Sequence, residues 1–156
     1  MKSIITNKKQ LKKKCKPVKN LKEGLHLGEL LLKILLRHPG AIGLAANQIG
    51  INKRVCVVNV SKKIILVNPR IISKFKKIKF QEGCLSFPGD YVITERYANV
   101  IVVDDNNGQT IFEAEDSILE CVCVQHEIDH LNGITMYERM PNPFILDKEI
   151  SNGEKE

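Results

Sequence analysis

Apolar side chains recur at helical spacing in two stretches of the chain. Between residues 21 and 35 they are mainly leucine and isoleucine, and His38-Pro39-Gly40 then supplies a helix stop and a turn. A second stretch runs from Ser117 to Leu131 and ends at Asn132-Gly133, a sequence typical of a helix C-terminus. We therefore expect one core helix early in the chain and another late.

Short runs of β-branched residues lie between the two predicted helices, separated by turn residues. Such runs indicate strands of a mainly antiparallel sheet system. The predicted strands cover residues 55–60, 64–67, 71–72, 100–103 and 110–114. The order is helix, strands, helix, without an internal repeat or a regular alternation of strand and helix. We therefore expect a single α+β domain over residues 1–156, in which a helix packs against antiparallel sheets.

The positive charge of the chain is concentrated at one end. The net charge is +6, but residues 1–22 contain nine lysines and no acid, so the remainder has a net charge of −3. We expect residues 1–20 to form a solvated, partly ordered basic arm, with a contact to ribosomal RNA phosphates as the alternative. The arm has no interleaved aromatic residues and no nucleic-acid motif, which argues against sequence-specific binding of nucleic acid. The tail, from about residue 151, is expected to fray.

The composition is that of a globular protein outside the membrane. With 43% hydrophobic residues, the chain can bury a core without a structural metal, so a metal site would be catalytic. No apolar run approaches the roughly 20 residues that cross a bilayer, and no secretory signal is recognisable. Five cysteines, without the spacing of a disulfide framework, favour a reducing compartment such as the cytoplasm. No interface stripe is visible, and we expect a monomer.

The most informative chemical pattern is His126-Glu127-Ile128-Asp129-His130. On a helix it places two imidazoles one turn apart on the same face, with a carboxylate beside them, which suits two metal ligands and a base. Because the pattern is short, an ordinary charged helix face is the competing interpretation. The extended metallopeptidase pattern fails, since Met136 stands where a third histidine is required. Glu149 could complete another protease site but lies next to the expected tail.

A thiolate is the remaining candidate for a third ligand. Cys84 lies within Glu82-Gly83-Cys84-Leu85-Ser86, between a glycine and a turn-forming proline. One cysteine and two histidines leave the fourth position of a tetrahedral ion open for water. Cys121 and Cys123 are two positions apart, on different faces of the predicted helix, so they do not indicate a second metal site.

Three segments, in this order, resemble the motifs of the peptide deformylase family: Gly-x-Gly-Leu-Ala-Ala-x-Gln, Glu-Gly-Cys-Leu-Ser and Gln-His-Glu-x-Asp-His-Leu. They stand at residues 41–48, 82–86 and 125–131. The resemblance extends from about Leu11 to Met140 and implies antiparallel sheets packed around a central helix that carries the two histidines. The chain departs from the family at Ala41, which replaces the first glycine, and only 23 residues follow Gly133, as in short, phage-encoded members.

The resemblance implies a metal-dependent hydrolase that removes the N-formyl group from the N-terminal formylmethionine of nascent polypeptides and releases formate. It implies that Cys84, His126 and His130 hold one divalent ion, whose bound water attacks the formyl carbon. Fe(II) is the ion that the family favours in the cell. The same donors also accept Zn(II), Ni(II) or Co(II).

The family pattern also implies roles for residues around the metal. Glu127 would act as general base and acid, and the Gln48 amide and the Leu85 backbone N–H would stabilise the oxyanion. Arg96 is expected to reach Asp129 and stiffen the ligand helix. The residues expected to contact the peptide are Ile42, Gly43, Leu44, Gly83, Tyr91, Val122 and Cys123.

The expected peptide contacts are of two kinds. The backbone near Ile42 to Leu44 and Gly83 would pair with the peptide as an additional strand. Val122 and Cys123 would line a pocket for the methionine side chain, or simply pack in the core. Tyr91 would border the groove, or pack beside the neighbouring proline.

Two other functions stay open at this point. A zinc endopeptidase would cleave unformylated peptides and would not need Cys84. A catalytically inactive deformylase-like module would dock on the ribosome through the lysine-rich arm. The source is also open, so the compartment is the cytoplasm of a bacterium, including a phage host, or an organelle.

Overall fold

The computed structural model of the chain describes residues 2–141, which form two three-stranded antiparallel sheets and three α-helices. The helices are α1 (Lys8–Leu11), α2 (Leu21–Leu35) and α3 (Ala114–Leu131), with 3₁₀ turns η1 (Ala46–Ile49) and η2 (Met136–Arg139). The first sheet has the order β1-β2-β3 and consists of Gly43–Ala45, Val55–Asn59 and Lys63–Val67. The second has the order β4-β5-β6 and consists of Arg70–Glu82, Val92–Asp104 and Gly108–Glu113.

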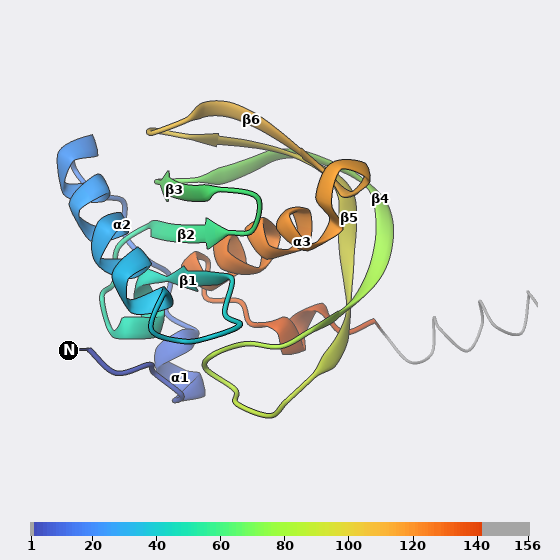
Figure 1. Cartoon of the computed structure of the whole chain (residues 1–156), viewed down its shortest axis with the longest axis horizontal. Helices are drawn as coiled ribbons and strands as arrows, with labels where there is room; N and C mark the ends of the chain where they lie inside the picture. The colour runs from blue at the N-terminus through green and yellow to red at the C-terminus, as the bar shows by residue number, and fades with distance from the viewer. Residues whose placement is uncertain (1, 142–156) are drawn as a thin grey trace, which may run out of the picture.

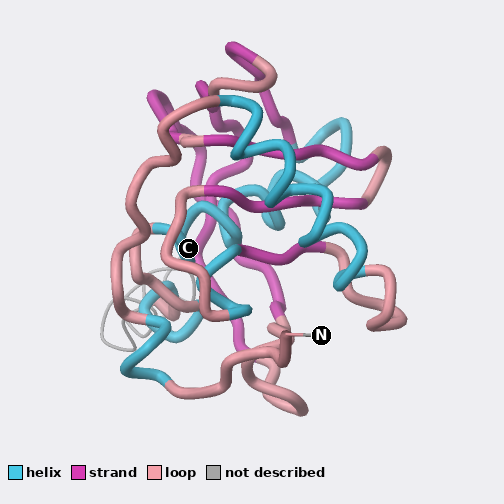
Figure 2. Tube along the Cα trace, turned by 90° about the vertical axis from the view of Figure 1, so that its left-hand side faces the viewer, coloured by secondary structure: helices cyan, strands magenta, loops and turns pink. Residues whose placement is uncertain are grey.

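Helix α3 lies at the centre of the molecule, between the two sheets (Figure 1). It contacts β1 and β2 of the first sheet and β5 and β6 of the second, whereas α2 packs against the first sheet alone. After a turn of 90°, the strands run through the middle of the molecule and loops lie around its periphery (Figure 2). The expected α+β fold, with antiparallel sheets packed around a central helix, is confirmed.

The first sheet is buried on both faces. Cys56 and Val58 belong to the core cluster that includes α3, whereas Val55 and Val57 belong to the cluster that includes α2. A strand that is covered on both faces has a continuous apolar run instead of an alternating one. This explains why β2 was recognisable from its sequence.

The strands of the second sheet are much longer than the sequence predicted. β4 and β5 have 13 residues each, where only residues 71–72 and 100–103 were expected. β4 is an edge strand, and its residues 73–77 are all exposed, so it has lysines in place of an apolar pattern. In β5, Thr94, Arg96 and Asp104 occupy buried positions, which hides the alternation of apolar side chains.

The lysine-rich N-terminal segment packs against the body of the protein. Leu11, Cys15 and Val18 are buried, and the backbone N–H of Cys15 donates to the carbonyl of Leu131 at 2.9 Å. All nine lysines between residues 2 and 22 are exposed. The expectation of a partly ordered arm is therefore wrong for the backbone, because apolar side chains between the lysines anchor it. The lysine side chains themselves are solvated, as predicted.

The regular part of α3 begins after Ser117. This residue has non-helical φ and ψ of −160° and 108°, and its Oγ accepts a hydrogen bond from the N–H of Glu120 at 3.1 Å, as in a helix N-cap. The predicted helices at residues 21–35 and 117–131 are thus confirmed. The tail predicted to fray lies outside the described residues. Within residues 2–141, no helix is long and apolar enough to cross a membrane.

Candidate active site

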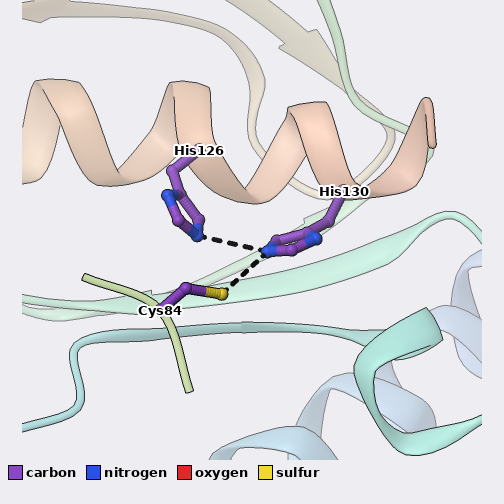
Figure 3. Close-up of side chains that lie close together, drawn as sticks. All are labelled: Cys84, His126 and His130. Carbon is purple, nitrogen blue, oxygen red and sulfur yellow. Dashed lines mark hydrogen bonds between the residues drawn. The ribbon is translucent and has the colours of Figure 1, made fainter. Parts of the chain in front are cut away.

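The side chains of Cys84, His126 and His130 point toward one another (Figure 3). The Sγ of Cys84 lies 3.4 Å from the Nε2 of His130, which lies 3.1 Å from the Nε2 of His126. All three atoms lie within 4.8 Å of one another. In the part of the chain that the structure describes, this is the one such group of three potential metal ligands.

The separations fit a metal ion. A tetrahedral ion about 2.3 Å from sulfur and about 2.0–2.1 Å from nitrogen requires ligand atoms roughly 3.4–3.6 Å apart. The separations of 3.4 and 3.1 Å are within a few tenths of an ångström of that requirement. Three protein ligands leave one position for water or substrate, as in catalytic sites.

The electrostatic surroundings of the histidines also favour a cation. Burial lowers the pKa of His126, but the carboxylate of Glu127 and the side chain of Cys84 raise this pKa well above its ordinary value. Burial and the neighbouring His126 lower the pKa of His130 well below its ordinary value. One ring therefore attracts positive charge while the other stays neutral, and a metal ion between the two Nε2 atoms suits both.

Glu82, the last residue of β4, orients one of the histidines. Its Oε1 lies 2.7 Å from Nδ1 of His126, and its carboxylate accepts hydrogen bonds from Nε and Nη2 of Arg96 at 2.6 and 2.8 Å. Burial raises the pKa of Glu82, but Arg96 and His126 lower it by a larger amount, so the pKa is about 2. The ionised carboxylate accepts the Nδ1 proton and leaves Nε2 free for the metal. Sequence reasoning missed this role, although Glu82 lies two positions before Cys84.

Arg96 also binds the ligand helix. Its Nη1 donates to Oδ2 of Asp129 at 2.5 Å, which confirms the pair expected from the sequence. Arg139 of η2 adds two hydrogen bonds to the same carboxylate, at 2.9 and 2.8 Å, which were not expected. Arg96 is only 2% exposed, so its pair with Asp129 is shielded from solvent, whereas the Arg139 side chain is 37% exposed. β5 and η2 thereby hold α3 through Asp129, which lies between the two histidines in the sequence.

Gln48 lies beside the thiol ligand. Its Nε2 donates to Oγ of Ser86 at 3.1 Å and lies 3.6 Å from Sγ of Cys84. Its Oε1 accepts the backbone N–H of Ala45 at 2.9 Å, which holds the side chain over its own turn. The amide group is thus fixed next to the metal ligands.

Glu127 is a buried carboxylate beside the ligands. It is 4% exposed, and burial raises its pKa to about 7, although the neighbouring His126 acts in the opposite direction. β1 passes so close that a Cβ atom on Gly43 would lie 2.5 Å from Oε2 of Glu127 and 2.6 Å from Sγ of Cys123. Only glycine allows β1 to approach the carboxylate to this distance.

These groups meet at a cleft of about 740 Å³. Most residues that the sequence singled out line it: Ile42, Gly43, Gln48, Gly83, Cys84, Leu85, Tyr91, Val122, Cys123, His126 and Glu127. His130 does not line the cleft and is completely buried behind it. The arrangement combines a metal site, a buried titratable carboxylate and an amide donor in one cleft.

A family model described as polypeptide deformylase matches residues 1–143 of this chain. The chain belongs to the peptide deformylase family. Peptide deformylases are metal-dependent hydrolases that remove N-formyl groups from nascent peptides. The expectations of a hydrolase, of a single family fold and of a metal-dependent reaction are therefore confirmed at the level of the family.

Individual deformylases are similar over most of the chain. The peptide deformylase of Heliobacterium modesticaldum is 43% identical over 136 residues, which cover 85% of this chain and 88% of that protein. The one from Hydrogenovibrio crunogenus is 43% identical over 130 residues, covering 79% and 75%. Among solved structures, a probable peptide deformylase from Synechococcus phage S-SSM7 has a TM-score of 0.79 at 33% identity and covers 90% of this chain and 100% of that one.

Not every residue expected to contact a deformylase substrate has its side chain in the cleft. Leu44 is completely buried in the core next to α2, so only its backbone can contact a peptide. Val122 and Cys123 are 2% and 5% exposed, so they pack in the interior and also line the cleft. Tyr91 is 70% exposed at the rim, and its ring approaches Gly83.

Ala41, the departure from the family motif, is accommodated by its neighbour. Gly40 has a φ of +84° and makes the turn that glycine favours, whereas Ala41 is not among the described residues with positive φ. The Ala41 methyl group lies at the cleft and packs against the α2 core cluster. The substitution is therefore compatible with an unstrained backbone.

Proposed function

We propose that this chain removes the formyl group from N-formylmethionyl nascent peptides at the site formed by Cys84, His126, His130 and Glu127. The C–N bond of the formyl amide breaks, the formyl carbon gains an oxygen from water, and formate and a free amine leave. Cys84, His126 and His130 would hold a divalent ion, which would supply Lewis-acid chemistry to water and to the formyl oxygen. The observation that carries the proposal is the convergence of these ligands with a buried carboxylate at one cleft.

Glu127 is the proposed general base and acid. A carboxylate with a pKa of about 7 can accept a proton from the attacking water and then donate it to the leaving nitrogen. The neighbouring His126 opposes the rise in this pKa and favours the form that accepts the proton. Glu127 lines the cleft, where the formyl group would lie.

Gln48 and Leu85 are the proposed donors to the formyl oxygen as it gains negative charge. The Gln48 amide is held 3.6 Å from the Cys84 thiol. Leu85 follows Cys84 directly and lines the same cleft, which supports its backbone N–H as the second donor. By comparison with other oxyanion holes, the loss of one such donor costs roughly 10²- to 10³-fold in rate.

The proposed peptide path follows a sheet edge. β1 is at the edge of its sheet, and Ile42 and Gly43 line the cleft. An extended peptide can bind there as an additional strand, with the Leu44 backbone and Gly83 as further contacts. Strand addition recognises the main chain, which suits an enzyme that acts on many nascent sequences.

The methionine side chain of the substrate is proposed to contact Val122 and Cys123. Both lie in the cleft one helical turn before His126, and both are apolar or weakly polar. Tyr91, at the exposed rim, is proposed to border the path of the following residues.

Fe(II) is the proposed metal in the cell. One thiolate and two imidazoles also accept Zn(II), Ni(II) and Co(II), so the identity depends on metal supply as well as on the site. Metal analysis of protein purified without oxygen tests this proposal. A stoichiometric content of another metal, together with full activity, would contradict it.

The lysines of the N-terminal segment are proposed to make transient contact with ribosomal RNA in the cytoplasm or an organelle. Lys12, Lys13 and Lys14 are consecutive, exposed and held on a packed backbone. Replacing all three with glutamate should weaken co-sedimentation with ribosomes and reduce its salt dependence. The matched control reverses three exposed lysines elsewhere in the chain, Lys62, Lys63 and Lys76. Equal effects in both variants would show a general effect of charge and would contradict a specific contact.

The chain itself is proposed to be monomeric.

The experiment that tests the function is formate release from formyl-Met-Ala-Ser by anaerobically prepared, iron-loaded protein. Rapid turnover is expected, and Glu127→Gln should reduce kcat roughly 10²- to 10⁴-fold without loss of metal, because proton transfer is impaired. Cys84→Ser should lose both metal and activity. Glu115→Gln, on an exposed position of α3, is the matched control and should retain full activity.

The same assay separates the alternatives. Cleavage of unformylated peptides that persists in Cys84→Ser would support a zinc endopeptidase. No turnover by a folded, metal-loaded wild type would contradict the proposed function and favour a module that binds the ribosome without catalysis.

A further inference from the structure

Asn47 joins the turn η1 to the end of the metal-binding helix. Its Nδ2 donates to the backbone carbonyl of His130 at 2.6 Å, and its side chain is buried. The next residue, Gln48, lies against Cys84 from the same turn. Successive residues of a 3₁₀ helix point about 120° apart, so neighbouring side chains reach different ligands. η1 is thereby fastened to both sides of the metal site.

The carbonyls at the end of α3 have several partners, and the backbone N–H of Gly133 also donates to the carbonyl of His130, at 3.0 Å. The last carbonyls of a helix have no partners within the helix itself. The carbonyl of Leu131 accepts hydrogen bonds from the backbone N–H of Cys15 at 2.9 Å and from Nη1 of Arg54 at 3.2 Å. Asn47 binds the carbonyl of His130 through a side chain from another element, so it connects η1 to the backbone from which the metal-binding ring projects.

The same pair of residues contains two complementary polar atoms that remain unpaired. Among residues 2–141, Oδ1 of Asn47 and Nδ1 of His130 are buried and lack a hydrogen-bond partner. A histidine that binds metal through Nε2 carries its proton on Nδ1, and that proton normally has an acceptor. An amide oxygen is a suitable acceptor, and that of Asn47 belongs to a side chain already bonded to the same residue.

We propose that Asn47 is a positioning residue for His130. Its N–H fixes the backbone of the ligand, and its amide oxygen serves, directly or through one water, as the acceptor that holds the Nδ1–H tautomer. Asn47 does not line the cleft, so it acts on the reaction only through His130. The inference deepens the proposed function and rests on its metal site.

Metal release measures this role without relying on activity. Asn47→Leu is similar in size and removes both contacts. A chelator is expected to extract Co(II) about 10- to 100-fold faster from this variant than from the wild type, as for other residues that orient metal ligands. The visible absorption bands of the Co(II) protein should also shift, because the geometry around the ion changes.

The control separates positioning from general destabilisation. Val102→Ala truncates a buried side chain of β5 that does not line the cleft, and it should lower stability while metal release stays within about twofold of the wild type. Asn47→Ser, which also removes both contacts, replaces Asn47→Leu if the latter does not fold. Equal release rates and unchanged spectra in the Asn47 variant and in Val102→Ala would overturn the inference.

The outcome for the wild type distinguishes the two proposals. A folded wild type that retains no Co(II) would contradict the metal site, and with it the proposed function. A wild type that retains Co(II) and releases formate, next to an Asn47 variant with unaltered metal release, would overturn only the role of Asn47.

Discussion

Single residues set the geometry around the metal site through contacts that are nearly closed to solvent. Glu82 links β4, Arg96 and His126 through one carboxylate, and Arg96 links it onward to Asp129 of α3. A buried charge network of this kind needs every member, because removing one leaves the others unpaired in the interior. Gly43 has the opposite role, since its lack of a side chain leaves room for Glu127.

A methyl group at position 43 should impair catalysis more than folding. In Gly43→Ala the new Cβ would lie 2.5 Å from Oε2 of Glu127 unless β1 or the carboxylate shifts. Since small displacements of catalytic groups can cost about 10²-fold, we expect kcat/KM to fall by about that factor with metal content unchanged. Formate release and metal analysis measure the two quantities.

Gly40→Ala is the control for this prediction. Gly40 has a φ of +84° but nothing within 4 Å of an added Cβ, so its substitution strains the same loop without touching Glu127. It should reduce stability more than activity. An equal loss of activity in both variants would show that loop strain, and not contact with Glu127, limits catalysis.

At the scale of elements, the N-terminal segment supports the parts that carry the proposed site residues. The backbone N–H of Ile5 donates to the carbonyl of Gln48 at 2.7 Å. Leu11 of α1 belongs to a small core cluster with Phe87 and Met136, against which Cys84 is packed. The segment therefore braces both η1 and the loop after β4, in addition to displaying its lysines.

Truncation of Leu11 should show that α1 is part of the folded body. Leu11 is completely buried, so Leu11→Ala is expected to lower the free energy of unfolding by about 2–5 kcal/mol, measured by urea denaturation. Leu21→Ala makes the same change at a 39% exposed position and should cost less than about 1 kcal/mol. Similar small losses in both variants would indicate a loosely attached arm.

At the scale of the whole molecule, the interior contains thiols that are neutral in the folded state. Cys15, Cys56, Cys121 and Cys123 are buried and form no disulfide among the described residues. Burial raises the pKa of Cys15 and Cys121 to about 11 and raises the pKa of Cys56 and Cys123 well above the ordinary value of 9.0. Folding is therefore linked to keeping these groups protonated.

Stability should consequently fall at alkaline pH. In the unfolded chain the Cys15 thiol ionises near pH 9, whereas in the folded protein it ionises near pH 11. Its contribution is fully present below pH 9 and is lost as the pH rises through this interval. Between pH 9 and pH 11, the free energy of unfolding should therefore fall by up to about 2–3 kcal/mol less in Cys15→Ala than in the wild type. Urea unfolding in the presence of reductant measures this difference. Parallel pH dependences of wild type and variant would refute this linkage.

Local pattern predicted the two long helices and the pair of histidines proposed as metal ligands. The predicted helical spans 21–35 and 117–131 correspond to α2 and to the regular part of α3. α2 buries one face, whereas residues 121–131 of α3 are buried on all sides. His126 and His130 are one turn apart on a single helix, so their convergence is a local property. Cys84 was identified through its motif, and the structure brings its thiol to them.

Tertiary structure decided the features that join distant segments or depend on burial. Glu82, Arg96 and Asp129 come from β4, β5 and α3, and no local periodicity relates them. β4 and β5 are long because they pair with each other. Backbone hydrogen bonds define this pairing, and they leave no apolar pattern in the sequence. The charge of the N-terminal segment predicts a solvated arm, whereas the buried side chain of Leu11 anchors the segment to the body of the protein. Charge and spacing describe a residue's own properties, whereas its role here depends on which residues the fold places against it.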